Sequence, residues 1–86
     1  MASYRISIRS KALKELAKLP QKQQVAISKA IKNLADDPFP HGHKKLQGNL
    51  NGYRIRVGDY RVIYDVVKDE LIIDVIRIRH RKDVYR

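Results

Sequence analysis

The stretch GYRIRVGDYRVIYDV, residues 52–66, constrains the fold of this chain more than any other part of the sequence. Apolar and polar residues alternate on both sides of Gly58-Asp59, a pattern typical of two half-buried strands joined by a tight turn. A glycine in a two-residue loop can take the positive φ that such turns require, and the loop length then sets the register. The predicted pairs are Val57 with Tyr60, Arg56 with Arg61, Ile55 with Val62, Arg54 with Ile63, and Tyr53 with Tyr64.

This predicted hairpin places Arg54, Arg56 and Arg61 on one face and the apolar residues on the other. Like charges directly across a sheet are destabilising. Guanidinium groups present paired donors to phosphate and stay protonated at any relevant pH. We therefore expect a polyanion outside the chain to neutralise this face. The alternative is a solvated face on which the arginines splay apart.

A third strand is predicted over residues 71–79, after the loop KDE. A loop of two residues and a loop of three send the side chains of this strand to opposite faces. We expect three, Lys68 to Glu70, which leaves Asp74 as a poor fit on the apolar face. With this register Ile72, Ile76 and Ile78 join the apolar face, and Arg77, Arg79 and Arg81 join the arginine face.

The N-terminal half predicts one strand and a helical hairpin. Residues 3–9 alternate like a half-buried strand, and apolar residues recur at helical spacing over 11–19 and 21–35, on either side of Pro20. Glu15 is placed to pair with Lys11 or Lys18 along the first helix. Residues 36–51 are expected to form a loop. The order predicts a single α+β domain, residues 1–86, with the helices on one face of a four-stranded antiparallel sheet.

Composition narrows the class of partner. The chain has 19 Lys plus Arg against 9 Asp plus Glu, a net charge of +10 and a pI near 10.2. Such a balance favours nucleic acid, an acidic protein or an anionic membrane surface, and of these we expect nucleic acid. The absence of cysteine excludes a disulfide scaffold and a cysteine-based zinc site. No apolar run is long enough for a membrane span or a signal peptide, so we expect a cytoplasmic protein without membrane association.

The chain end IRIRHRKDVYR adds His80, Arg81 and Tyr85 after the last predicted strand. Cleavage of RNA by its own 2′-hydroxyl needs a base for that hydroxyl, cations at the phosphate and an acid for the leaving 5′-oxygen. An imidazole, a guanidinium and a phenol provide all three kinds of group. Tyr85 could also stack on a base of single-stranded RNA. His41-Gly42-His43 has the spacing of two metal ligands, but nothing nearby completes a site, so we expect no metal and no cofactor.

Three motifs together carry a resemblance that covers nearly the whole chain. They are Lys-Leu-x-Gly at residues 45–48, Arg-x-x-x-Gly-x-Tyr-Arg at 54–61, and His-Arg-x-x-x-Tyr at 80–85. With them the sequence resembles the RelE superfamily of bacterial and archaeal toxins. The resemblance implies an mRNA interferase that enters the ribosomal A site and cuts the message there. It also implies an acidic, RelB-like cognate antitoxin that inactivates the toxin in a hetero-oligomer.

The resemblance also suggests roles for individual residues. Arg54 and Arg56 match two strand cations of the family, Arg61 matches the arginine after Gly-x-Tyr, and Arg81 and Tyr85 match the terminal pair. The expected catalytic set is Arg56, Arg61, His80, Arg81 and Tyr85, and the expected RNA-binding set is Lys44, Lys45, Arg54, Arg77 and Arg79.

The general base is the open point of this assignment. Relatives often carry lysines where this chain has Arg54 and Arg56, and an arginine resists deprotonation. One candidate is His80, since the ordinary pKa of histidine is about 6.5. Another is Tyr85 as a phenolate, and a third possibility is that positioning and charge stabilisation dominate.

Two other functions compete with RNA cleavage. The ParE branch of the same fold inhibits DNA gyrase and cuts no RNA, and a basic module could bind RNA without cleaving it. The coexistence of Arg61, His80, Arg81 and Tyr85 favours the RelE branch, because a pure inhibitor does not need that set.

Overall fold

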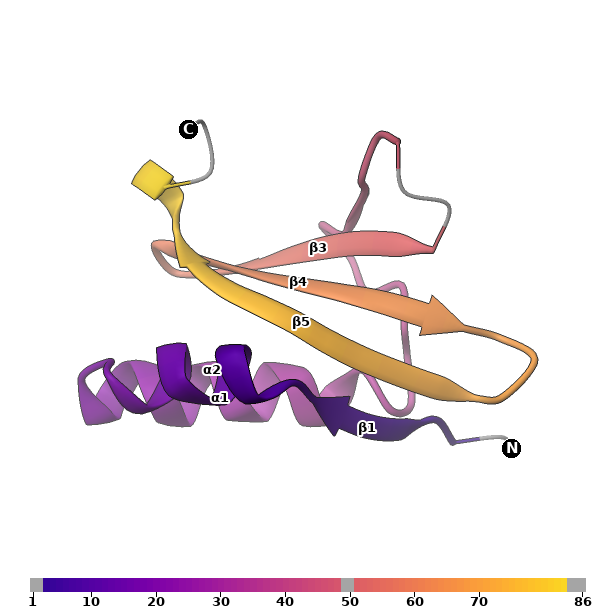
Figure 1. Cartoon of the computed structure of the whole chain (residues 1–86), viewed down its shortest axis with the longest axis horizontal. Coiled ribbons are helices and arrows are strands. Elements are labelled where there is room, and N and C mark those ends of the chain that lie inside the picture. The colour runs from indigo at the N-terminus through magenta and orange to yellow at the C-terminus, as the bar shows by residue number, and fades with distance from the viewer. Residues whose placement is uncertain (1–2, 49–50, 84–86) are drawn as a thin grey trace.

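The computed structural model describes residues 3–48 and 51–83, and Figure 1 shows the arrangement of its elements. The helices are α1 (Ser10–Ala17) and α2 (Gln21–Asn33), and a short 3₁₀ turn, η1 (Arg81–Asp83), follows the last strand. The strands are β1 (Arg5–Ile8), β2 (Lys44–Lys45), β3 (Gly52–Val57), β4 (Tyr60–Val67) and β5 (Ile72–His80). None of the described helices combines the length and the apolar character needed to cross a bilayer.

The strands form one mixed sheet in the order β1-β5-β4-β3-β2. β1 runs parallel to β5, and the other neighbours are antiparallel. The α+β class is confirmed, but the expectation of a four-stranded antiparallel sheet is wrong in two respects. Lys44 and Lys45 add a fifth strand at the β3 edge, too short for any alternation in the sequence to mark it, and β1 pairs in parallel.

Both helices cover the same face of the sheet, as predicted (Figure 1). The helices bury one residue from α1, Ala12, and three from α2 and its end, Ile27, Ile31 and Leu34. The three residues of α2 recur at the spacing of one helical face. The sheet contributes Ile55, Val62, Tyr64, Val66, Ile73, Val75 and Ile78. The core therefore lies between the helices and one face of the sheet, and neither α1 nor α2 covers the opposite face.

Tyr64 is the largest fully buried side chain of this core. Its hydroxyl donates a hydrogen bond of 2.7 Å to the carbonyl of Pro38, which anchors the segment after α2 to the sheet. Burial, together with the charge of Asp37, raises the pKa of Tyr64 far above the ordinary value. The phenol therefore remains a neutral donor.

The β3–β4 hairpin has the register that the sequence predicts at every pair from Val57–Tyr60 to Tyr53–Tyr64. Gly58 in its two-residue turn has a φ of +61°. This is the conformation that favours glycine in tight hairpin turns.

The β4–β5 pairing differs from the prediction twice. The connecting loop has four residues, Lys68 to Leu71, because Leu71 takes a φ of +56° and Val67 pairs with Ile72. Ile73 and Val75 therefore enter the core in place of Ile72, and Asp74 faces away from it. A bulge then inserts Ile76, so that Ile63 pairs with Arg77 and Tyr64 with Val75. The two shifts cancel, and Arg77 and Arg79 reach the predicted face.

Asp74, which does not fit the predicted register, binds Arg9 between β1 and α1 instead. Its Oδ2 accepts a hydrogen bond of 3.0 Å from Nε of Arg9, the residue that precedes α1. That hydrogen bond raises the pKa of the Arg9 guanidinium. The contact joins the end of β1 to β5.

Candidate functional site

Three arginines from three adjacent strands lie side by side on the face of the sheet that the helices leave open. Arg56 of β3 pairs with Arg61 of β4, and Arg61 pairs with Arg79 of β5. Neighbouring strands lie about 4.8 Å apart, so the three side chains start close together. We call Arg56, Arg61 and Arg79 the arginine row.

The core fixes which way the arginine row faces. Ile55, Val62 and Ile78 alternate with the three arginines and are all buried under the helices. Turning any of these strands over would expose an isoleucine or valine and bury a charge. The central member, Arg61, keeps only 5 % exposure, whereas Arg56 is exposed and Arg79 is half-buried.

Basic residues continue from the row toward the β3 edge. Arg54 lies on the same face, two residues from Arg56, and pairs with Lys44 of β2. Lys45 pairs instead with Tyr53, and its Nζ lies 4.7 Å from the centre of the Tyr53 ring. The structure thus places Lys44 and Arg54 beside the row and Lys45 over an aromatic ring on the other face.

Arg81 lies beside the β3–β4 turn, next to the arginine row. Its backbone N–H donates a hydrogen bond of 2.8 Å to the carbonyl of Asp59, and its Nε lies 3.7 Å from Oδ1 of the same residue. The side chain is 64 % exposed. The segment after β5 is therefore bound to the β3–β4 turn. Only the Val57–Tyr60 pair separates that turn from the Arg56–Arg61 pair.

His80 is not brought into the row. It pairs with Tyr60, one residue beyond the Arg61–Arg79 pair, and so points to the opposite face of the sheet. Its ring packs edge-on against Tyr60, with 5.2 Å between ring centres, and its Nδ1 accepts a hydrogen bond from the backbone N–H of Lys82. Tyr85, the other candidate base, lies outside the described residues.

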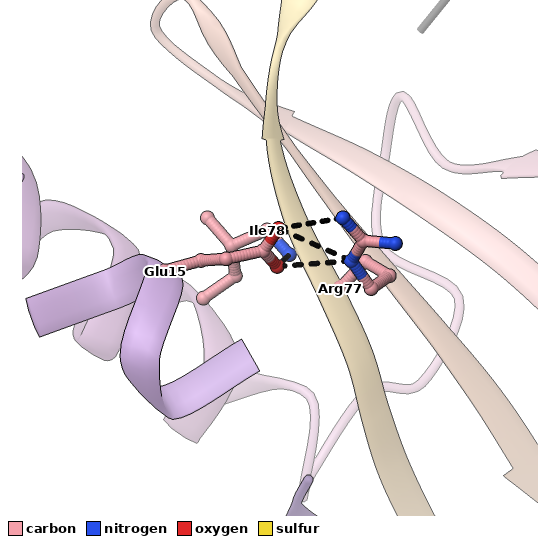
Figure 2. Close-up of polar contacts among 3 residues, drawn as sticks. All are labelled: Glu15, Arg77 and Ile78. Carbon is pink, nitrogen blue, oxygen red and sulfur yellow. Dashed lines mark hydrogen bonds and ion pairs between the residues drawn. The ribbon is translucent and has the colours of Figure 1, made fainter. Parts of the chain in front are cut away.

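Arg77 has a partner within the fold (Figure 2). Glu15 of α1 accepts hydrogen bonds of 3.1 and 2.8 Å from Nε and Nη2 of Arg77, and another of 2.9 Å from the backbone N–H of Ile78. The sequence predicts that Glu15 pairs with a lysine of its own helix, whereas its ion pair runs to β5. Because β1 stops alongside Val75, Glu15 satisfies the N–H that the edge of β5 would otherwise leave open.

The electrostatics of this contact favour both charged forms. Burial alone would raise the pKa of Glu15, but the hydrogen bonds from Arg77 and Ile78 outweigh it and hold the pKa below the ordinary value of 4.5. The same bonds raise the pKa of Arg77. The sequence does not predict the contact of Glu15 with Arg77, because only tertiary packing brings α1 to β5.

The histidine pair of the 36–51 loop has a packing role. His43 lies against the rings of Phe39 and Tyr53, and its Nδ1 donates a hydrogen bond of 2.8 Å to the carbonyl of Pro40. Among residues 3–48 and 51–83 no group of three or more His, Cys, Asp or Glu side chains is placed to hold a metal ion.

Comparisons with known proteins agree with this architecture. A family model described as the ParE toxin of the type II toxin–antitoxin system parDE matches residues 6–85. A protein of Escherichia coli described as a RelE-like toxin is 37% identical, over 95% of this chain and 90% of its own length. Toxin RelG of Mycobacterium tuberculosis is 31% identical, over 96% of this chain and 97% of its own.

A solved structure also has the same fold. The archaeal RelE–RelB complex from Pyrococcus horikoshii contains a chain that superposes with a TM-score of 0.84 at 30% identity, covering 95% of this chain and 99% of that one. The chain described here therefore belongs to the RelE/ParE superfamily of type II toxin–antitoxin toxins.

Proposed function

We propose that this toxin is an endoribonuclease that cuts messenger RNA on the ribosome, in the cytoplasm, and thereby stops translation. The observation that carries the proposal is the arginine row, in which Arg61 lies directly between Arg56 and Arg79. Three arginines on neighbouring positions of rigid strands form a site for a phosphodiester whose negative charge grows as the 2′-oxygen attacks.

The roles of the side chains follow from their positions. Arg61 and Arg79 bind the non-bridging phosphate oxygens, and Arg81 approaches the phosphate from the hairpin end. Arg54 and Lys44 hold the backbone of the adjoining nucleotide. The guanidinium groups provide the positive charge themselves, so the proposed cleavage does not depend on a metal ion. As the 2′-oxygen bonds to phosphorus, the bond from phosphorus to the 5′-oxygen breaks, which leaves a 2′,3′-cyclic phosphate. The 2′-hydroxyl proton passes to a base that the arginines cannot supply, because they remain protonated, and the leaving 5′-oxygen takes a proton from an acid or from water.

The comparisons support the toxin's partner as well as its class. The Pyrococcus structure is a complex of RelE with RelB. With a net charge of +10, this chain is suited to an acidic, amphipathic antitoxin of the RelB kind, and we propose that the two form a hetero-oligomer in which the toxin is inactive.

Mapping the ends of transcripts tests the cleavage directly. On induction of the wild-type chain without antitoxin, we expect primer extension to show new 5′ ends inside translated regions within minutes. The same messages made untranslatable by removal of their ribosome-binding sites serve as the control and stay intact. Unchanged transcripts in arrested cells would contradict the proposal.

A second candidate function rests on the family model, which is described by its ParE toxins. The ParE branch implies inhibition of DNA gyrase, and a supercoiling assay with purified gyrase separates the two candidates. We expect no inhibition at toxin concentrations that cut messages. Inhibition with intact messages would favour the second candidate.

The placement of His80 gives a sharper prediction about the base. Because its ring points to the Tyr60 side of the sheet, we expect His80→Ala to keep message cleavage within about threefold of wild type. If His80 were the base, the variant would lose most of its cleavage activity. Rates of single-turnover cleavage on purified ribosomes between pH 5.5 and 8 decide between these results.

A further inference from the structure

A second basic surface lies on α1, away from the arginine row. Lys11, Lys14 and Lys18 fall three and then four residues apart, which places them on one face of the helix. All three are exposed, and together with Ser10 and Glu15 they line one surface hollow along α1. We call Lys11, Lys14 and Lys18 the lysine stripe.

The charges of the lysine stripe are not balanced within α1. Like charges four residues apart, such as Lys14 and the C-cap residue Lys18, repel each other along a helix. Glu15 is the one acidic residue of the α1 sequence SKALKELA, and its carboxylate is bound to Arg77 and to the backbone of β5. Within α1 the stripe therefore has no carboxylate beside it that is not already bound to β5.

Glu15 also shows where the stripe lies relative to the row. Its carboxylate reaches across the edge of β5 to Arg77, two residues from Arg79 on the same face (Figure 2). The positive charge of Arg79 is close enough to help lower the pKa of Glu15. Basic side chains therefore follow one another from the arginine row, past Arg77 at the β5 edge, to the hollow along α1.

We propose that the lysine stripe binds the sugar–phosphate backbone of the same RNA strand that is cut at the arginine row. The inference rests on the proposed function for the nature of the ligand. RNA that leaves the row toward β5 meets Arg77 and then the stripe, whose first and last lysines are about 10 Å apart along the helix. These contacts read no bases, because lysines bind phosphates as point charges, so they increase affinity for RNA of any sequence.

The chain contains its own matched control. α2 also carries three exposed lysines, Lys22, Lys29 and Lys32, on one face of the helix. α2 lies against β3, and Val25, 62 % exposed, is placed on the face of these lysines. Changing three lysines to glutamine on either helix removes the same charge, but only α1 adjoins the β5 edge.

Binding to a single-stranded 2′-O-methyl RNA of twelve nucleotides tests the proposal. The RNA lacks the attacking hydroxyl, so the result does not depend on whether the chain cleaves. Fluorescence anisotropy between 50 and 300 mM salt gives the slope of log K against log salt, and each phosphate contact with single-stranded RNA contributes about 0.7 to it. We expect K11Q/K14Q/K18Q to reduce the slope by about 2, and K22Q/K29Q/K32Q by less than about 0.5.

Thermal melting first shows that both triple variants are folded. Equal losses in the two variants would overturn the proposal, since bulk charge would then explain them, and so would an unchanged slope in the α1 variant. If the α1 variant bound the oligonucleotide normally but bound ribosomes weakly, the occupant would be ribosomal RNA and the proposal would be wrong. Cleavage by the α1 variant should show a raised KM with kcat unchanged, as expected for contacts equally strong in the ground and transition states.

Discussion

Arg61→Ala is expected to lower the single-turnover rate of message cleavage on purified ribosomes at least about 100-fold. Loss of one donor to a developing oxyanion usually costs 10²–10³ in rate. Arg61 is the central member of the arginine row and is 5 % exposed, so under the proposed function its charge would act on the phosphate with little screening by water. The side chain faces away from the core, and we therefore expect the variant to fold and to bind antitoxin.

Two further variants make this result specific. Arg61→Lys keeps the charge but loses the paired donors, so its rate should fall between those of wild type and alanine. Arg5→Ala removes one exposed positive charge from β1, outside the row, and should leave the rate within about twofold. A folded Arg61→Ala protein that cuts messages at the wild-type rate would show that the row is not the phosphate site.

Glu15→Ala is expected to lower the free energy of unfolding by about 2 kcal/mol, or the melting temperature by roughly 8–16 °C. The substitution removes the acceptor of three donor groups at once, because it leaves Nε and Nη2 of Arg77 and the Ile78 N–H without their carboxylate. Both side chains of the pair are less than one third exposed, so the loss exceeds that of a typical surface ion pair. Urea unfolding at pH 7 measures it, and Glu70→Ala, in the exposed loop before β5, is the control expected to stay within about 0.5 kcal/mol.

The same contact predicts a dependence on pH. The pKa of Glu15 is lower in the folded chain than its ordinary value of 4.5, so the folded state binds this proton less readily than the unfolded state. The stabilisation is complete above pH 4.5 and is lost as the pH falls through the folded pKa. The stability difference between wild type and Glu15→Gln should therefore shrink in acid. A difference that stays constant from pH 7 to pH 3 would show that the charge of Glu15 does not contribute.

The part of the fold that could be predicted best is the β3–β4 hairpin. A two-residue loop with a glycine permits one register, and the alternation of apolar residues on both strands agrees with it. The Arg56–Arg61 pair follows from these two local facts alone. Local chemistry was sufficient because the two strands are joined by the shortest possible connection.

The position of β5 could not be predicted in the same way. Its loop is four residues long because Leu71, which is not a glycine, adopts a left-handed backbone conformation, and no residue pattern announces the bulge at Ile76. Each feature shifts the side chains by one position, and the two shifts compensate only beyond the bulge. The predicted face of Arg79 was therefore confirmed, while the predicted place of Ile72 in the core was wrong. The misfit of Asp74 was the one sign of this in the sequence.

For the candidate site, the sequence predicts the face on which each side chain lies better than it predicts the contacts of that side chain. Alternation along β5 gives Arg77 and Arg79 the same expected environment, yet α1 brings Glu15 to one and not to the other. Alternation along β5 also places His80 and Arg79 on opposite faces of the sheet, although the motif that contains His80 suggests that they act together. Contacts between segments 62 residues apart, such as Glu15 and Arg77, arise from packing that no local pattern encodes.

The parallel pairing of β1 with β5 has a consequence for how the chain is made. Among the described strands, β1 pairs only with β5, Ile72–His80, which is synthesised more than 60 residues later. During vectorial synthesis the N-terminal segment must wait for most of the polypeptide, since contacts distant in sequence close late. A partly synthesised chain therefore lacks the strand that aligns Arg79 with Arg61, and the arginine row is complete only once β5 has been made.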